Sequence, residues 1–170
     1  MLLICGGLPG TGKSTIARLL AARLGAVWLR IDSIEQALIR AETVTRHDIG
    51  PAGYLAAYAI AADNLRLGNV VIADAVNPIA ITRQAWREVA TENAAPYLEI
   101  EVTCSDQTQH RYRVENRAAD IRGHILPDWQ QVITRDYEPW HSASLVLDTS
   151  VLSAEEAVER IVAHIESHRR

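Results

Sequence analysis

A glycine-rich stretch near the start of the chain constrains the fold more than any other feature. Residues 7–14 read G-x-x-x-x-G-K-S, with a further glycine at position 10. An apolar run at residues 2–5 precedes this stretch, and apolar residues at helical spacing follow it. Glycines let the backbone curl with its N–H groups facing inward, and the positive end of the following helix also attracts anions. Strand, loop and helix therefore stand in the order of the phosphate-binding P-loop.

The lysine of this stretch, Lys13, is the only lysine among 17 lysine and arginine residues. An ammonium on a flexible stem can reach between the β- and γ-phosphates of a nucleotide, where a planar guanidinium would not fit. The alternative is a glycine turn that binds nothing. We prefer phosphate binding, because both the motif and its flanking elements are in place. The residues expected to form this cradle are Gly7, Pro9, Gly10, Thr11, Gly12, Lys13 and Ser14.

Length and composition predict one domain over residues 1–170. With 170 residues, of which 48% are hydrophobic and 22% charged, the chain can bury one ordinary core. Cys5 and Cys104 are far apart, each at the end of an apolar run, which favours buried free thiols and a cytoplasmic location over a disulfide. We expect no secretory leader and no membrane span. A net charge of -4 argues against general nucleic-acid binding.

Apolar runs alternate with helical patterns along the whole chain. The second to fifth strands are expected at residues 26–31, 70–73, 97–102 and 145–147. The later helices are expected at residues 33–40, 51–67 and 77–90, and a capping box at Ser153 and Glu156 opens the last one. Such βα repeats predict an α/β fold with a parallel sheet and helices on both faces. Glu99 and Glu101 are awkward for a strand that is covered on both faces.

Two carboxylates are expected at the carboxyl ends of the second and third strands, where ligands bind in open parallel sheets. Asp74 follows an apolar run and, with the hydroxyl of Ser14, suits a magnesium ion beside a triphosphate. Asp32 would then be free to orient and deprotonate an incoming hydroxyl. A plain helix cap is the alternative for Asp32. Asn77, which precedes a proline, is either an N-cap or a substrate contact.

An arginine cluster lies between the fourth and fifth strands, at Arg111, Arg113, Arg117 and Arg122. Arg113 and Arg117 are four residues apart, so on a helix they would project from one face. The following segment contains Gly123 and Pro127 and has no clear period. We expect a mobile lid at residues 111–128 whose arginines neutralise a phosphoryl group in transfer. The alternative is a solvated basic face partly paired to Glu115.

Residues 2–40, the segment 74–77 with Arg83, and the arginine cluster together resemble the P-loop kinases that phosphorylate small hydroxyl compounds. That group includes gluconate and shikimate kinases, chloramphenicol phosphotransferase, zeta-type toxin kinases and the kinase domain of polynucleotide kinases. The resemblance implies a five-stranded parallel sheet in the order 2-3-1-4-5, an Arg-rich lid, and ATP and Mg²⁺ as cofactors. It also implies that residues 147–149 build part of an adenine pocket.

Particular residues match the functional positions of these kinases. Lys13, Ser14 and Thr15 match the phosphate-binding positions, and Asp32 matches the acid that activates the acceptor. Asp74 matches the acid at the end of the third strand. Arg113 and Arg117 match lid arginines, and Arg113 is also expected to bind the nucleotide.

The region expected to bind the acceptor matches the family less well. A polynucleotide-kinase-like site would carry an arginine a few residues after the acid, but here Ser33, Ile34 and Glu35 follow Asp32, which argues against a phosphate-bearing acceptor. Four further residues could line an acceptor pocket or be solvated, namely Arg46, His47, Tyr54 and Tyr58.

The sequence as a whole predicts a phosphotransferase that moves the γ-phosphate of Mg-ATP to a hydroxyl of a small molecule, acting as a monomer or homodimer. A nucleotide or sugar-nucleotide kinase is one alternative. An ATP-binding switch or ATPase without an acceptor is another. An acid placed to activate an acceptor favours transfer over a switch.

Overall fold

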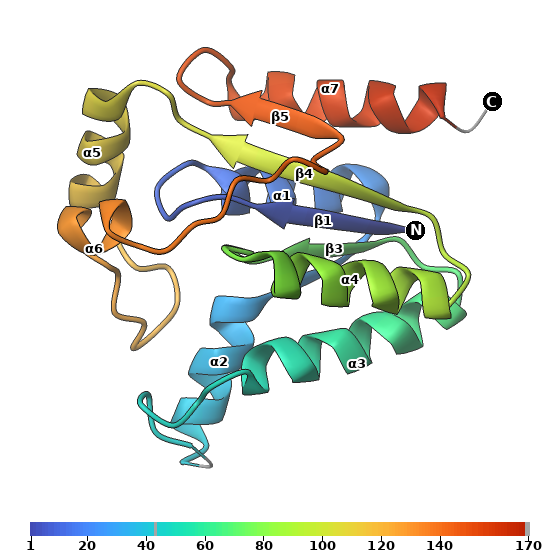
Figure 1. Ribbon diagram of the computed structural model, residues 1–170, viewed down its shortest axis with the longest axis horizontal. Coiled ribbons are helices and arrows are strands. Elements are labelled where there is room, and N and C mark those ends of the chain that lie inside the picture. The colour runs from blue at the N-terminus through green and yellow to red at the C-terminus, as the bar shows by residue number, and fades with distance from the viewer. Residues whose placement is uncertain (43, 169–170) are drawn as a thin grey trace.

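The computed structural model describes residues 1–42 and 44–168. Its centre is a sheet of five parallel strands in the order β2-β3-β1-β4-β5 (Figure 1). This is the order expected from the sequence, and it is that of a P-loop NTPase fold. The strands are β2 (Val27–Arg30), β3 (Val71–Asp74), β1 (Leu2–Gly6), β4 (Tyr97–Thr103) and β5 (Leu145–Asp148).

Helices cover both faces of the sheet. On one face α1 (Lys13–Leu24) and α7 (Ala154–Ser167) pack on side chains that include Leu3 and Cys5. On the other face α3 (Ala52–Arg66) and α4 (Ala80–Glu92) pack on side chains that include Leu2 and Ile4. Because successive side chains of a strand point to opposite faces, the continuous apolar run of β1 serves both cores.

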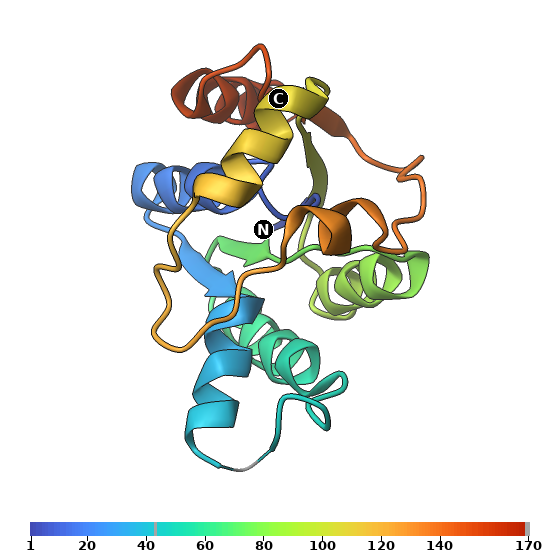
Figure 2. The ribbon, with the colours of Figure 1, turned by 90° about the vertical axis from the view of Figure 1, so that its left-hand side faces the viewer.

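The remaining helices gather at the carboxyl ends of the strands. These are α2 (Ile31–Arg40), α5 (Gln107–Asn116) and α6 (Trp129–Ile133). Figure 1 shows α5 and α6 beyond the arrowheads of the strands, and Figure 2 shows the connection between them running past α2. The fold therefore places polar loops and helix ends around one edge of the sheet, as in other open parallel sheets.

Two expected boundaries are wrong, and both lie near this edge. Strand β2 ends at Arg30, so Asp32 lies in the first turn of α2 rather than at the end of a strand. Helix α4 begins at Ala80 rather than at Asn77, and its N-cap is Ile79. Asn77 has a φ of 49°, which a helix cannot accommodate. The capping box of Ser153 and Glu156 at the start of α7 is confirmed.

The two glutamates of β4 are accommodated by polar partners. Glu99 is 2% exposed, and its carboxylate pairs with Arg87 of α4 at 2.6 Å. Glu101 accepts a hydrogen bond of 2.9 Å from the hydroxyl of Tyr137. Glu99 is therefore paired from a helix that covers the sheet, which is the usual condition for burying a charge, and the half-buried Glu101 is bound from the connection between α6 and β5.

Cys5 and Cys104 are free thiols, as expected, but only Cys5 is fully buried. Burial raises the pKa of the Cys5 thiol, and the neighbouring Asp74 raises it further. Cys5 is therefore an inert packing residue. Among the described residues, no helix is both long enough and apolar enough to cross a bilayer.

Candidate active site

The loop between β1 and α1 forms an open cradle. Its glycines include Gly10 and Gly12, with φ of 87° and 91°, values that other residues rarely adopt. Gly12 is the N-cap of α1, and no side chain caps this helix end. The first N–H groups of α1 are therefore available to a ligand, at the end of the helix where its dipole favours anions.

Neighbouring elements hold the cradle in shape. The hydroxyl of Thr11 donates a hydrogen bond of 2.9 Å to the carbonyl of Leu8. His110 of α5 contacts the carbonyl of Pro9 at 2.9 Å, and Thr149, which follows β5, donates to the carbonyl of Thr11 at 2.7 Å. Because one bond within the loop and two from separate segments fix it, the loop is preorganised rather than shaped by its ligand.

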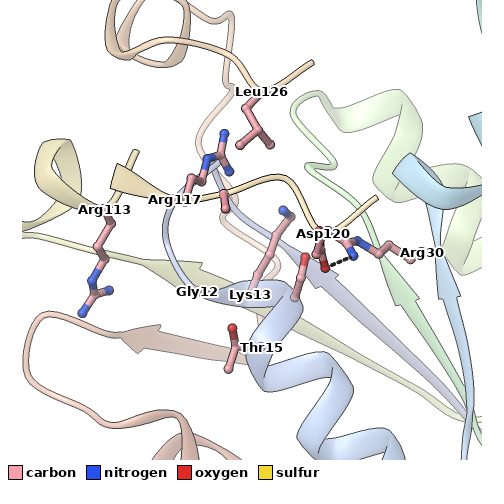
Figure 3. A pocket seen from close by; sticks show the side chains of 11 residues that line it. Gly12, Lys13, Thr15, Arg30, Arg113, Arg117, Asp120 and Leu126 are labelled. Atoms are coloured by element: carbon pink, nitrogen blue, oxygen red, sulfur yellow. Dashed lines mark hydrogen bonds and ion pairs between the residues drawn. The ribbon is translucent and has the colours of Figure 1, made fainter. Parts of the chain in front are cut away.

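Lys13 is 7% exposed, and within the described residues it makes no ion pair and no side-chain hydrogen bond. A buried cation without a partner is costly, so the site is better matched when an anion is present. Figure 3 shows the Lys13 ammonium pointing toward the space between Arg117 and the paired Arg30 and Asp120. This space is a cavity of about 360 Å³ lined by Gly10, Gly12, Lys13, Ser14, Thr15, Arg30, Arg113, Arg117, Ala118, Asp120 and Leu126.

Ser14 and Asp74 meet as expected. The hydroxyl of Ser14 donates to Oδ1 of Asp74 at 3.1 Å, although the two residues are 60 positions apart. The other oxygen, Oδ2, accepts a hydrogen bond of 3.2 Å from the indole of Trp28, on β2. Trp28 was missed by the sequence reasoning, because only the pairing of β2 with β3 brings it beside Asp74.

A second cavity, of about 460 Å³, opens next to the first. Lys13, Ser14, Arg30 and Arg117 line both cavities. At its far end, the second cavity is lined by side chains from α2, from the α2–α3 connection and from the region around α6. Its other lining residues are Pro9, Asp32, Glu35, Arg46, Val76, His124, Ile125, Leu126, Pro127, Gln131 and Arg135. Asp32 thus lies in the same hollow as the phosphate-loop lysine.

Two further residues at this hollow were not anticipated. Arg30 makes a bidentate ion pair with Asp120, at 2.6 and 2.9 Å, which ties β2 to the segment after α5. His124 Nε2 lies 4.0 Å from Oδ2 of Asp32. Burial lowers the pKa of His124, and the nearby carboxylate of Asp32 opposes that effect. The position of Arg30 at the end of a strand was a signal that could have identified it.

The arginine cluster does not lie on one helix face. Arg113 is on α5 and binds the hydroxyl and carbonyl oxygens of Thr149, at 2.7 and 2.9 Å. Arg117 lies just beyond the helix in an extended conformation, which removes the expected shared face. In the described structure, Nε and Nη2 of Arg117 are buried without a hydrogen-bond partner. Arg122 is exposed and lines neither cavity.

A comparison with known protein families matches residues 2–134 to the model of the AAA domain. The chain belongs to the AAA domain family. One curated relative, the mouse (Mus musculus) threonine synthase-like 1, is 23% identical to this AAA domain over 163 residues. That match takes in 94% of this chain and 21% of the relative, so this AAA domain spans about a fifth of the relative's length.

Solved structures agree on the fold of this AAA domain. A protein of Chloroflexus aurantiacus, assigned as a kinase by inference, superposes with a TM-score of 0.76 at 21% identity, over 98% of this chain and 96% of that chain. The APS kinase of Mycobacterium tuberculosis in complex with AMPPNP and APS superposes with a TM-score of 0.67 at 18% identity, over 97% of this chain and 96% of that chain. A gluconokinase of Sinorhizobium meliloti superposes with a TM-score of 0.62 at 16% identity, over 99% of this chain and 97% of that chain. The expected likeness to P-loop small-molecule kinases is confirmed at the level of fold.

Other candidate residues of this AAA domain have structural partners. Asn77 is fully buried and binds the carbonyl of Cys5 and the indole of Trp86. Arg83 is buried and donates to the carbonyls of Asn77, Pro78, Glu138 and Pro139. The hydroxyl of Tyr54 accepts a hydrogen bond of 3.4 Å from the Asn77 N–H, and Tyr58 packs edge-on against Trp86. His47 is exposed. None of these residues lines either cavity.

The residues present fit a magnesium ion and a nucleotide. A serine hydroxyl and a carboxylate that converge beside a phosphate cradle are what Mg²⁺ takes from proteins, because it retains several waters and binds substrate phosphates. In the described chain, no group of three or more acidic, histidine or cysteine side chains could hold a metal by itself, so a metal here would depend on the ligand's phosphates and on water. The uncapped start of α1 and the unpaired Lys13 fit the phosphates.

Proposed function

We propose that this protein is a kinase that transfers the γ-phosphoryl group of Mg-ATP to a hydroxyl of a small molecule. One observation carries the proposal. Lys13 and Ser14, which would hold the nucleotide's phosphates, line a second cavity that also contains the carboxylate of Asp32. A protein that only binds ATP as a switch has no need of a second hollow with an acid facing its phosphate loop.

Each residue has a distinct role in this proposal. Lys13 and the first N–H groups of α1 bind the β- and γ-phosphates, and Ser14 and Asp74 hold magnesium with its waters. Asp32 orients the acceptor hydroxyl and takes its proton. Magnesium, when bound, neutralises charge that develops on the phosphates.

Arg117 is the best candidate to meet the phosphoryl group in transfer, because it lines both cavities, has two unsatisfied donors and, unlike Arg30, makes no ion pair with a described carboxylate. Those donors are preorganised toward charge that appears in the transition state. Arg113 contributes differently. Since its guanidinium is bound to Thr149, it stabilises the nucleotide end of the site rather than closing over the phosphates.

The size of the second cavity supports an acceptor site beside the phosphate loop. At about 460 Å³ it is the size of an ordinary metabolite pocket. A nucleotide or sugar-nucleotide acceptor remains the main alternative among kinases, and an acceptor-independent ATPase is the alternative of another class.

Measuring ADP release with and without acceptors tests the proposal. Purified protein with Mg-ATP is assayed alone and with separate pools of polyols, hydroxy acids, sugar phosphates and nucleosides. We expect background turnover alone and a clear rise with one pool, with a product that is heavier by one phosphoryl group in mass spectrometry. The Lys13→Ala variant serves as the blank. Turnover that is equal with and without every pool identifies an ATPase and refutes the kinase proposal.

A further inference from the structure

We propose that the acceptor is a hydroxylated anion, whose carboxylate or phosphate group binds to Arg46 and Arg135 while its reacting hydroxyl lies at Asp32. This inference rests on the proposed kinase function and specifies its acceptor. The argument comes from how charge is distributed along the second cavity.

The second cavity has a phosphate end and a distal end. Lys13 and Ser14 line the phosphate end. Arg46 and Arg135 come from segments outside the sheet, the first from the connection between α2 and α3 and the second from just beyond α6. Both arginines act electrostatically on the carboxyl of Glu35. Burial and the charge of Asp32 raise the pKa of this carboxyl, whereas the charges of Arg135 and Arg46 lower it. Asp32, Glu35, Arg46 and Arg135 therefore line the same cavity as Lys13, Arg30 and Arg117.

Neither arginine is neutralised by a carboxylate at contact distance. Arg46 donates to the neutral oxygens of Gln36 and Gly123, at 3.4 and 3.3 Å, which is long for a hydrogen bond. Arg135 makes no ion pair and no side-chain hydrogen bond within the part of the chain that the structure describes. By contrast, Arg30 at the same cavity is paired with Asp120 through both of its terminal nitrogens, and only its Nε lacks a hydrogen-bond partner among the described residues. The distal pair therefore keeps free donors for a ligand.

The carboxylates and the arginines select different parts of one molecule. Asp32 accepts hydrogen bonds from hydroxyls and repels an anionic group placed against it. A guanidinium pair binds a carboxylate or phosphate through several charge-assisted hydrogen bonds. An acceptor that satisfies both carries hydroxyls at one end and a negative charge at the other.

This arrangement also changes one expectation from the sequence. The arginine that should follow Asp32 is absent, and Glu35 stands near its place, which argued against a phosphate-bearing acceptor. In the folded chain, Arg46 and Arg135 approach that same glutamate from other segments. The missing positive charge is thus supplied by residues that are distant in sequence.

Calorimetry with matched probe pairs tests the inference. The protein is first saturated with Mg-AMPPNP, so that the phosphate loop cannot bind the probes. Gluconate is then compared with sorbitol, and ribose 5-phosphate with ribose. We expect one of the two anions to bind about tenfold or more tightly than its neutral partner, as charge-assisted contacts require. Which of the two does so separates a carboxylate from a phosphate.

The variant Arg46→Gln/Arg135→Gln should lose this preference, whereas sorbitol and ribose should bind it as before. The control, Arg23→Gln/Arg160→Gln, removes the same charge from two exposed arginines that line neither cavity and should keep the preference. Each single substitution is also made, and its thermal unfolding midpoint is measured. These measurements distinguish a loss of ligand binding from a loss of folding.

Equal binding of the anionic and neutral probes by the parent protein overturns the inference. So does a preference for anions that survives in the Arg46→Gln/Arg135→Gln variant. The loading step tests the kinase proposal separately, because failure to bind Mg-AMPPNP refutes the proposed function itself. The probe pairs are therefore also measured without nucleotide, where the same comparison of variants decides the role of the two arginines.

Discussion

The indole N–H of Trp28 donates a hydrogen bond of 3.2 Å to Oδ2 of Asp74, and the hydroxyl of Ser14 holds Oδ1 of the same carboxylate at 3.1 Å. The carboxylate is thus fixed from both sides, by the neighbouring strand and by the first turn of α1. We infer that Trp28 positions Asp74 for the magnesium role proposed above, without touching nucleotide itself.

Replacing Trp28 with phenylalanine keeps a large ring and removes the N–H. We expect the affinity for magnesium to fall about 10- to 100-fold, the usual effect of removing a partner that orients a metal ligand. Nucleotide binding titrated against Mg²⁺ measures it. Binding of nucleotide without magnesium should stay unchanged. If it weakens to the same extent, Trp28 has only a packing role.

Lys13→Ala should abolish transfer with little change in stability, because the ammonium serves the ligand. Lys13→Arg should also be inactive, since a planar fork does not occupy the position of a compact ammonium. Activity is followed by ADP release and stability by thermal unfolding. Retained transfer in the arginine variant would contradict the phosphate role.

Substitutions of the two carboxylates, Asp32 and Asp74, should have different effects. Asp32→Asn should lower the transfer rate by about 10²- to 10⁴-fold, the usual contribution of a positioned base, and leave Mg-nucleotide affinity nearly intact. Asp74→Asn should weaken magnesium-dependent nucleotide binding. Single-turnover rates and nucleotide titrations distinguish them, and the opposite pattern would reverse the two assignments.

Arg117→Ala should lower kcat by about 10²-fold or more with a smaller effect on KM, consistent with the loss of one preorganised donor to developing charge. Arg113→Ala should instead weaken nucleotide binding, because its side chain holds Thr149 beside the P-loop. Arg122→Ala is the matched control, since Arg122 is exposed and lines neither cavity. Steady-state kinetics decide the matter: a kcat of the Arg117 variant within about threefold of the parent would exclude it from the transfer step.

Arg87→Leu should destabilise the protein by about 3–5 kcal/mol, because it leaves the carboxylate of Glu99 buried and unpaired. Adding Glu99→Gln should recover much of that loss, since an amide is cheaper to bury than a charge. Urea unfolding of the single and double variants measures the free energies. If the double variant is no more stable than Arg87→Leu, the pair is not what accommodates Glu99.

The fold could be predicted because its signals are local. The apolar run of β1, the glycines of the loop, and the capping box at Ser153 each act within a few residues of chain, and the βα alternation then fixes a parallel sheet. The expected boundary at Asn77 failed because Asn77 is held by a residue that is distant in sequence. The side-chain amide of Asn77 binds the carbonyl of Cys5 and the indole of Trp86. Its backbone is in a left-handed conformation that the sequence does not predict.

Part of the candidate site could be proposed from the sequence. Lys13, Ser14, Asp32 and Asp74 follow from the motif and from the rule that ligands bind at the ends of parallel strands. The pairing of Arg30 with Asp120 joins residues 90 positions apart, and no local pattern encodes it. Arg46 and Arg135 sit in irregular segments with no period, so only the folded chain brings them together with Asp32.

The proposed nucleotide end is built on the ends of β1 and β3 and on the first turn of α1, whereas Arg46 and Arg135 lie in connections outside the sheet. Changes in the sheet disturb both hydrophobic cores, but connections tolerate substitution and insertion at little thermodynamic cost. Evolution can therefore exchange the acceptor while it keeps the phosphoryl donor. The same separation makes the distal segments the natural place to redesign acceptor specificity on an unchanged scaffold.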